Sequence, residues 1–362
     1  MKVPNIFSAS SLKLASFPEH IKRWRQGWTV PPITLEIQPS ERCNHSCPKC
    51  QGKFSLPADE VRFRAKSGED LDLNLLQSIW EEPPQGIVIS GNTGEPLLYP
   101  HLIDLLKILH EKNIPTIFIT NGEKLTSEIA LHLVKTCRGI RISLDAGDPI
   151  NFFRTHGRIA QWEVVNDSIR LLLRKRAALC LSPLNCRIGI GYLTDEKSIS
   201  GMSKATMLAC DLGVDYIQFR PYHYNKLNIS DKLDDCVSLA NGRLDVISSS
   251  QKYDIMESGS RNYRQCHGSN FYSVLDARGD IYICCHHIGN AQAVIGSLGE
   301  KTWKEIIYSK SRYDKISTFD VSDCLPFCRL NAHNETLEEY RSNGILPSKN
   351  NDPLIQNHAV FL

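Results

Sequence analysis

The sequence predicts an α/β protein, built as a partial barrel of six βα units followed by a small Cys-rich module with a β-hairpin and a helix. Residues 32–221 alternate short β-branched runs with longer helical patterns, the order typical of a parallel sheet covered by helices. Several of the β-branched runs are apolar throughout, as strands buried on both faces are. From residue 263 the pattern changes to short β segments placed between cysteines.

The barrel elements follow from these patterns in chain order. Strands are expected at Ile33–Gln38, Gly86–Ser90, Pro115–Thr120, Ile140–Leu144, Cys186–Leu193 and Asp215–Arg220. Helices with apolar residues at helical spacing are expected at Leu71–Glu81, His101–Lys112, Thr126–Thr136, Gln161–Arg176 and Ser198–Leu212. Six such units over about 190 residues predict a barrel that is open on one side, with a site at the C-terminal edge of its sheet.

Five segments are predicted along the chain. They are an N-terminal extension (1–31), the barrel (32–221), a connector without a clear period (222–262), the Cys-rich module (263–330) and a polar, partly irregular tail (331–362). In the module, Phe271–Asp276 and Asp280–Cys284 flank a Gly-containing turn and predict a hairpin, and Lys301–Tyr308 has a helical pattern. The connector is expected to hold at most one helix.

Composition excludes several classes of protein. Lysine and arginine number 42 against 40 acidic residues, so a net charge of +2 gives no long-range attraction to nucleic acid or to anionic membranes. No run of about 18 apolar residues and no secretory signal occurs, which predicts a protein of the cytoplasm without membrane spans. Thirteen cysteines in such a chain indicate metal or redox chemistry rather than disulfides.

Cys43, Cys47 and Cys50 form a C-x3-C-x2-C triplet directly after the first predicted strand. A [4Fe–4S] cluster normally takes four thiolates, so a loop that gives three leaves one iron open to bind a small molecule. The alternative is a structural zinc site, which requires four closed ligands. His45 lies inside the triplet, where we expect the loop not to turn it onto the same metal.

This triplet, placed after the first strand of a partial barrel, resembles the radical S-adenosylmethionine (SAM) superfamily. The resemblance covers about residues 30–221. It implies that the amino and carboxylate groups of SAM chelate the open iron, and that an electron passed through the cluster breaks the sulfonium bond to give a 5′-deoxyadenosyl radical. The resemblance also implies an electron donor such as flavodoxin or ferredoxin.

The same resemblance assigns SAM-binding roles to residues at successive strand ends. Gly94 and Glu95 follow the second strand where the family places a Gly-Gly-Glu-Pro motif that receives the SAM ammonium, although Thr93 replaces one glycine. Asn121 follows the third strand, and Ser143 and Asp145 end the fourth, near the expected methionine or ribose. Taken singly, Asn121 could belong to an ordinary turn and Asp145 could cap the next segment.

Three further positions are weaker matches to the family pattern. Gly189–Gly191 on the fifth strand and Gln218–Pro221 on the sixth are expected near adenine and substrate. Lys49 stands where relatives often carry an aromatic residue over the adenine, so a stacking role is doubtful there.

A second, dispersed cysteine set lies in the C-terminal module. Cys266, Cys284, Cys324 and Cys328 resemble the SPASM and twitch extensions, which carry auxiliary [4Fe–4S] clusters in part of the superfamily. Four ligands imply one auxiliary cluster, and structural zinc on the same thiolates is the alternative. Since a hairpin alternates side-chain direction, Cys285 is expected on the opposite face from Cys284, either packed or acting as a thiol hydrogen donor.

Together these features predict an enzyme that oxidises or epimerises a small, sugar-like molecule through the 5′-deoxyadenosyl radical. A peptide or protein side-chain maturase of the SPASM type is one alternative. About 30 residues before the first strand are too few for the leader-binding domain of many such maturases, which makes this alternative less favoured. A non-catalytic zinc or redox-sensing protein is the other.

Overall fold

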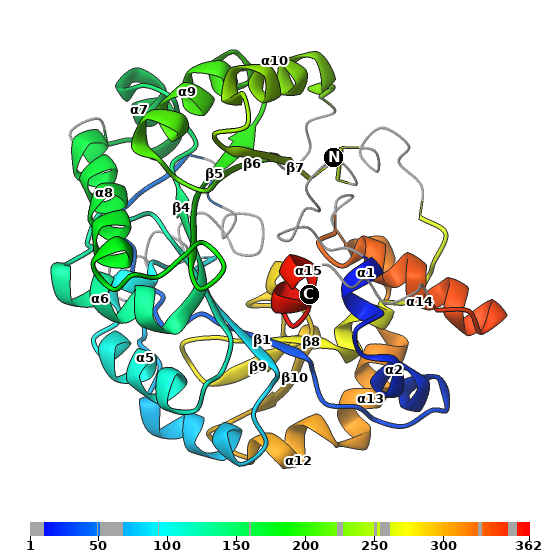
Figure 1. The fold of residues 1–362 in the computed structure, drawn as a ribbon. Helices are drawn as coiled ribbons and strands as arrows, with labels where there is room; N and C mark the ends of the chain where they lie inside the picture. The colour runs from blue at the N-terminus through cyan, green and yellow to red at the C-terminus, as the bar shows by residue number, and fades with distance from the viewer. Residues whose placement is uncertain are drawn as a thin grey trace.

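A computed structural model describes residues 11–48, 50, 68–92, 94–158, 161–222, 227–249, 252–253, 261–324, 328–346 and 353–362. Within these residues ten strands form one sheet in the order β10-β9-β8-β1-β2-β3-β4-β5-β6-β7, curved into an open ring (Figure 1). The strands are β1 (Thr34–Ile37), β2 (Gly86–Ile89), β3 (Thr116–Thr120), β4 (Cys137–Ser143), β5 (Arg187–Thr194), β6 (Tyr216–Pro221), β7 (Asp245–Ser248), β8 (Tyr272–Leu275), β9 (Asp280–Tyr282) and β10 (Val294–Ser297). β1 to β7 and β8 pair in parallel, and β9 and β10 add antiparallel strands at one edge.

Helices cover the outer face of the curved sheet (Figure 1). They are the 3-10 helix η1 (Leu73–Glu81), α5 (Leu102–Glu111), α6 (Ser127–Thr136), α7 (Pro149–His156), α8 (Trp162–Ala178), α9 (Met202–Leu212) and α10 (Ser230–Ala240). In α5 the apolar residues Leu102, Leu105 and Leu109 recur at helical spacing and are buried in the same core as Ile87 and Ile89 of β2. The outward-facing side chains of the strands therefore form the main hydrophobic core.

The partial βα barrel expected from the sequence is confirmed, and all six predicted barrel strands are present. The structure differs in the segment expected to be an irregular connector. There α10 is followed by β7, which pairs in parallel with β6. The short apolar stretch around Ile247 supplies this strand, and its pairing satisfies the backbone groups at the edge of β6. The helix expected at Leu71–Glu81 is a 3-10 helix over Leu73–Glu81 rather than an α-helix.

The segment after residue 330 is more ordered than its polar composition suggested. It forms α14 (Asn331–Asn343) and α15 (Pro353–His358), and Figure 1 shows α15 inside the ring of strands. The hydroxyl of Thr34 donates to the carbonyl of Val360 at 2.7 Å, and Phe361 packs against Val88 and Ile117. Residues 359–362 thus fill the barrel lumen where β1 and β2 begin, so a site in the lumen must open at the opposite, C-terminal edge.

The C-terminal module packs against the β1 side of the barrel. It contains the β8–β9 hairpin, α12 (Trp303–Ile307) and α13 (Lys310–Thr318), while the short helices α1 (Ser11–Leu14) and α2 (Pro18–Arg25) lie nearby. Buried Arg312 donates to the carbonyls of Val30 and Asn270 at 2.8 Å each, which joins the module to the chain before β1. Among the described helices, none is long and apolar enough to cross a membrane.

Candidate cluster and cofactor site

Three cysteines lie on the loop that follows β1. Cys43, Cys47 and Cys50 are half-buried, and the backbone N–H of Cys50 donates to the carbonyl of Cys47 at 3.3 Å. An ion pair between Arg42 and Asp70 fixes the start of this loop to the barrel. All three thiols therefore stand at the C-terminal edge of the sheet.

The thiols of this loop have an environment that disfavours free thiolates. Burial and the nearby charge of Glu95 together raise the pKa of Cys43 to about 12. The Cys50 thiol donates to the carbonyl of Asn92 at 3.4 Å. A bound metal reverses this preference, because a coordinated thiol is deprotonated outright. Three such thiols on one loop are the donor set that a [4Fe–4S] cluster with one open iron requires.

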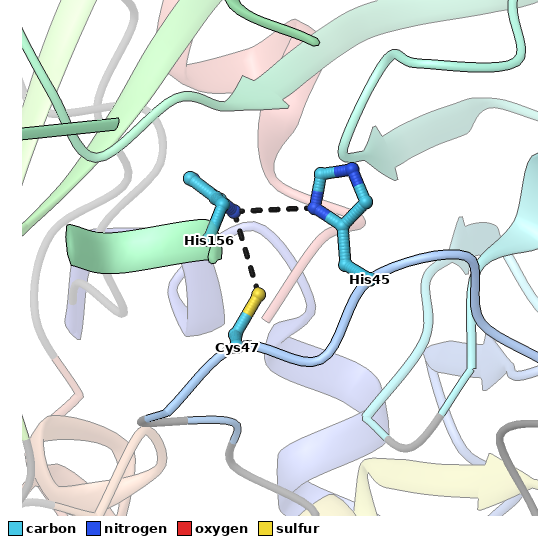
Figure 2. Close-up of side chains that lie close together, drawn as sticks. All are labelled: His45, Cys47 and His156. Carbon is cyan, nitrogen blue, oxygen red and sulfur yellow. Dashed lines mark hydrogen bonds between the residues drawn. The ribbon is translucent and has the colours of Figure 1, made fainter. Parts of the chain in front are cut away.

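Two histidines lie beside Cys47, as Figure 2 shows. His156, on α7, has its Nδ1 atom 3.4 Å from the sulfur of Cys47 and 3.4 Å from Nδ1 of His45. The three candidate ligand atoms all lie within 4.8 Å of one another. His45 and Cys47 thus lie within reach of one metal ion, although we expected the loop not to turn His45 onto the metal of the triplet.

Both histidines are held by their second ring nitrogens. Nε2 of His45 lies 2.8 Å from the carboxylate of Glu123, and Nε2 of His156 lies 3.0 Å from the carbonyl of Leu144. Both of these partners are acceptors, so each Nε2 donates. Burial lowers the pKa of His45 to about 4 and also lowers that of His156, which favours the neutral form of both rings. Metal-binding histidines are commonly oriented by partners of this kind.

The loop after β2 contains Gly94 and Glu95. A Cβ atom on Gly94 would lie 1.8 Å from the carbonyl oxygen of Ser40, so only glycine fits where this loop crosses the start of the cysteine loop. The Glu95 carboxylate accepts from the backbone N–H of Leu97 at 3.0 Å and from that of Asn121 at 2.8 Å, and from the hydroxyl of Thr120. Burial raises its pKa to about 7. Thr93 and Lys49 lie outside the described residues.

Asn121 links the end of β3 to the cysteine loop. Its Nδ2 group donates to Oδ1 of Asn44 at 3.0 Å, and its own Oδ1 accepts from the backbone N–H of Glu123 at 2.9 Å. Nδ2 of Asn44 is buried and finds no acceptor among the described residues. Because a buried donor without an acceptor is costly, this group indicates that a polar ligand belongs beside Cys43.

Ser143 and Asp145 lie at the end of β4, beside β5. Ser143 is half-buried and pairs in register with Gly191. Asp145 adopts a left-handed backbone conformation with φ of +50°, and its Oδ1 atom accepts from the backbone N–H of Leu193 at 2.7 Å. Its second oxygen lies 3.7 Å from Nε2 of His156. Asp145 therefore ties β4, β5 and α7 together at the edge of the sheet where the cysteine loop lies.

The sequence-based prediction missed Glu123 and Arg158. Glu123 is buried and binds His45, while Arg158 lies 3.3 Å from the Glu123 carboxylate and donates to the carbonyl of Asn44 at 2.9 Å. The acidic residue directly after Asn121-Gly122 was the available signal for Glu123. Arg158 directly follows Gly157, the C-terminal cap of α7. No pattern in the sequence relates Arg158 to the cysteine loop.

The second cysteine set is gathered around the hairpin. Cys266 precedes β8, Cys284 follows β9, and Cys324 and Cys328 come before α14. Burial and the charges of Cys266 and Cys324 raise the pKa of Cys328 to about 12. The charge of Cys328 contributes to the raised pKa of Cys284. These four predicted ligands therefore share one neighbourhood. His287 approaches it as well, with Nε2 3.5 Å from the sulfur of Cys324.

The two cysteines of the doublet do not point to opposite faces. The Cys284 thiol donates to the sulfur of Cys285, which lowers the pKa of Cys285 and raises that of Cys284. The expected alternation is wrong because β9 ends at Tyr282, and a 3-10 turn begins at Cys285. Cys284 lies beside the other thiols, whereas the sulfur of Cys285 is 3.8 Å from Nη1 of Arg329.

The first and second cysteine sets are joined through the end of β2. Asn92 accepts from Cys50 with its backbone carbonyl and donates to the carbonyl of Cys285 with its side chain. Arg329, next to Cys328, forms an ion pair with Glu36 on the lumen face of β1, and Glu36 also accepts from the hydroxyl of Ser90 at 2.6 Å. The space between the two sets is therefore lined by polar side chains of the barrel lumen.

Comparison with known families decides the class of the barrel. Residues 37–180 match the Radical SAM superfamily. This part of the chain is a radical SAM domain. It includes the cysteine loop with Cys43, Cys47 and Cys50, and also Glu95 and Asp145, whereas the second cysteine set lies outside the matched residues.

Relatives of the radical SAM domain align over part of the chain. GTP 3′,8-cyclase of Nostoc sp. is 33% identical over 142 residues, an alignment covering 38% of this chain and 42% of that protein. A UPF0026 protein of Helicobacter pylori is 28% identical over 122 residues, covering 32% of this chain and 39% of that protein. The chain thus spans well under half the length of these relatives.

Solved structures with a similar fold cover much more of the chain. SuiB of Streptococcus suis, bound to S-adenosylmethionine, is 16% identical with a TM-score of 0.63, covering 88% of this chain and 77% of that chain. Native anSMEcpe with bound AdoMet is 16% identical with a TM-score of 0.55, covering 91% and 96% respectively. At this identity the likeness concerns the fold, and it extends beyond the radical SAM domain into the C-terminal module.

Proposed function

We propose that this protein is a radical SAM enzyme that oxidises or epimerises a small, sugar-like molecule, with one [4Fe–4S] cluster at the cysteine loop and a second in the C-terminal module. The observation that carries the proposal is the position of three thiols at the strand edge, beside Glu95, Asn121 and Asp145. A peptide substrate is less favoured, since fold likeness at 16% identity transfers no substrate from SuiB, whose structure with a precursor peptide is also known.

The donor set fits these cofactors. Cys43, Cys47 and Cys50 supply three soft ligands from one loop, which suits an iron–sulfur cluster with an open iron and leaves a closed zinc site one ligand short. The buried Nδ2 group of Asn44, which lacks an acceptor among the described residues, suits a polar ligand such as SAM beside that loop. When bound, the cluster and SAM would together supply a 5′-deoxyadenosyl radical.

The chain's own residues would bind and orient SAM. The Glu95 carboxylate would accept from the amino group of SAM, and Asn121 and Asp145 would position its methionine and ribose from the neighbouring strand ends. Residues 359–362 close the opposite end of the lumen and limit the entry of water there. Such exclusion protects a reactive species from side reactions.

The second cluster would be held by Cys266, Cys284, Cys324 and Cys328. A closed set of four thiolates leaves no position for substrate, so its role would be to receive an electron during an oxidation. Asn92 and Arg329 lie between this set and the cysteine loop and would separate the substrate from each cluster. A reduced flavodoxin or ferredoxin of the cytoplasm would donate electrons to the first cluster.

The second candidate is a non-catalytic zinc protein, and the two histidines beside Cys47 are the observation that favours it. Two ligands bound to zinc at about 2.0–2.3 Å in a tetrahedron lie roughly 3.5 Å apart. The 3.4 Å separations from His156 to Cys47 and to His45 are close to that value. Cys47 cannot serve the zinc site and the cluster at once, so metal content separates the two candidates.

Anaerobic reconstitution tests the proposal directly. The purified protein is expected to be brown, to hold about eight irons as two four-iron clusters require, and to form 5′-deoxyadenosine from SAM when reduced with dithionite. Zinc in place of iron at the cysteine loop, lost in the variant His156→Gln, together with absence of 5′-deoxyadenosine, would establish the zinc candidate instead. In the proposed enzyme, His156→Gln retains iron because all three thiols remain.

SAM affinity is expected to depend on pH through Glu95. Since its pKa is raised to about 7, the carboxylate is mostly neutral at pH 6 and mostly ionised at pH 8, and only the ionised form accepts well from the SAM amino group. SAM binding should therefore be about tenfold tighter at pH 8 than at pH 6, measured by calorimetry on the reconstituted protein.

The isosteric variant Glu95→Gln is the control for this pH dependence. The side chain keeps the shape of Glu95 but does not titrate, and its single amide oxygen can replace one of the two carboxylate oxygens, which accept separately from the backbone N–H groups of Leu97 and Asn121. SAM binding by this variant should be weaker and independent of pH over the same range. An equal pH dependence in the variant would show that Glu95 is not the titrating group.

A further inference from the structure

The lumen faces of β4, β5 and β6 carry a set of arginines that the radical SAM chemistry does not use. Arg141 on β4 and Arg220 on β6 both approach Gly191, which lies between them on β5. A Cβ atom on Gly191 would lie 3.3 Å from Cδ of Arg141 and 3.3 Å from Nη2 of Arg220. The two guanidinium groups thus converge over a glycine that leaves room for them.

Neither guanidinium group is fully satisfied within the described part of the chain. Nη1 of Arg141 donates to the side-chain oxygen of Gln218 at 3.0 Å. The Nε groups of Arg141 and Arg220 are both buried and have no acceptor among the described residues. Because buried polar groups are nearly always hydrogen-bonded, these donors indicate an acceptor that the described residues do not supply, as a ligand in the lumen would.

Two more cations act on the same space. The charges of Arg220 and Arg329 lower the pKa of Lys252, and the charge of Arg329 also lowers the pKa of Arg141. Two carboxylates oppose these four cations: Glu36, which is paired with Arg329, and Asp145, which already accepts from Leu193. The lumen is therefore left with an excess of positive charge.

This excess is unfavourable without an anion. Burial, followed by the charge of Arg220, lowers the pKa of Arg141 to about 9, and burial lowers the pKa of Lys252 to about 7. Like charges held together in a partly desolvated space repel one another, whereas a guanidinium pair binds an oxyanion through charge-assisted hydrogen bonds. Arginine suits planar carboxylate and tetrahedral phosphate groups alike.

We infer that Arg141 and Arg220 form a binding subsite for an oxyanion, so that the substrate carries a phosphate or carboxylate group. The inference rests on the proposed function, because it assigns the subsite to the substrate of the radical SAM reaction. It narrows the sugar-like substrate to an acidic one, such as a sugar phosphate or a sugar acid. Gln218 aligns Arg141 toward that group.

The test uses reconstituted protein saturated with SAM, at low ionic strength. Inorganic phosphate and acetate are titrated separately by calorimetry, because the first represents a phosphate ester and the second a carboxylate. Phosphate, acetate or both should bind, and tighter binding of one identifies which oxyanion the substrate carries. Arg141→Gln and Arg220→Gln should each weaken binding of the more tightly bound anion by about ten- to a hundredfold.

Two further variants make the result specific. Arg170 lies on the exposed face of α8 and pairs with Asp167, so Arg170→Gln should bind the anion as the unchanged protein does. Arg220→Lys keeps the charge and should retain part of the anion affinity. This variant still tests the role of Arg220 if Arg220→Gln fails to fold. The inference is overturned if neither anion binds, if both glutamine variants bind like the unchanged protein, or if phosphate displaces SAM.

Anion binding and the proposed function can fail separately. Calorimetry at equilibrium requires no turnover, whereas 5′-deoxyadenosine formation requires no substrate. Anion binding without SAM cleavage would reject the radical SAM activity alone. SAM cleavage without anion binding would reject the oxyanion subsite alone.

Discussion

Replacing Cys43, Cys47 and Cys50 together with alanine should remove about four of the eight irons and abolish 5′-deoxyadenosine formation. The three thiols are the soft ligands that the cysteine loop offers, and a cluster that loses all of them has no attachment to the barrel. Iron analysis, visible absorption and product chromatography on the same anaerobic preparation measure both effects. The second cysteine set should keep its four irons in this variant.

A matched control distinguishes cluster loss from general damage. Cys180 is exposed and Cys210 is half-buried, and both lie far from the cysteine loop in sequence. The double variant Cys180→Ala, Cys210→Ala should therefore keep about eight irons and full SAM cleavage. If the triple variant still formed 5′-deoxyadenosine, the cysteine loop would not be the site of SAM cleavage and the proposed function would be wrong.

The barrel was predictable because its strands are apolar and short and its helices have a clear period. Each strand from β1 to β6 lies within three residues of its predicted bounds, and α5 begins and ends one residue inside its prediction. Local patterns suffice where burial on both faces demands a continuous apolar run. The order of the strand ends then places Glu95, Asn121 and Asp145 at one edge of the sheet.

Other features depend on contacts that no local pattern contains. β7 is four residues long and exists because β6 offers it a parallel partner. Val360 and Phe361 pack in the lumen with Val88 and Ile117, although their sequence resembles an irregular tail. The histidine pair beside Cys47 joins residues 111 positions apart, so only the folded chain brings His156 to the cysteine loop.

All thirteen cysteines lie in the described part of the chain, and none forms a disulfide. Outside the two sets, Cys137, Cys186 and Cys236 are buried, where a cysteine packs as a small hydrophobe, whereas Cys180 is exposed at a left-handed position after α8.

The final prediction separates Cys284 from Cys285. Cys284 lies beside Cys328 and the other thiols of the second set, whereas Cys285 faces Arg329, Glu36 and the lumen. Cys284→Ala should therefore lose about four irons, and Cys285→Ala should keep about eight. The reverse pattern would make Cys285 the ligand, and eight irons in both variants would show that the doublet supplies no ligand.

The position of Cys285 also decides between the two proposed reactions. If its thiol donates a hydrogen atom to the substrate carbon, turnover in deuterated water should place one deuterium in the product, and Cys285→Ala should consume substrate without forming the epimer. If the second cluster instead accepts an electron from the substrate, the product carbon stays unlabelled and two electrons leave each substrate molecule. Because the Cys285 sulfur is buried and lies 3.8 Å from Nη1 of Arg329, we expect packing and therefore the unlabelled, oxidised product.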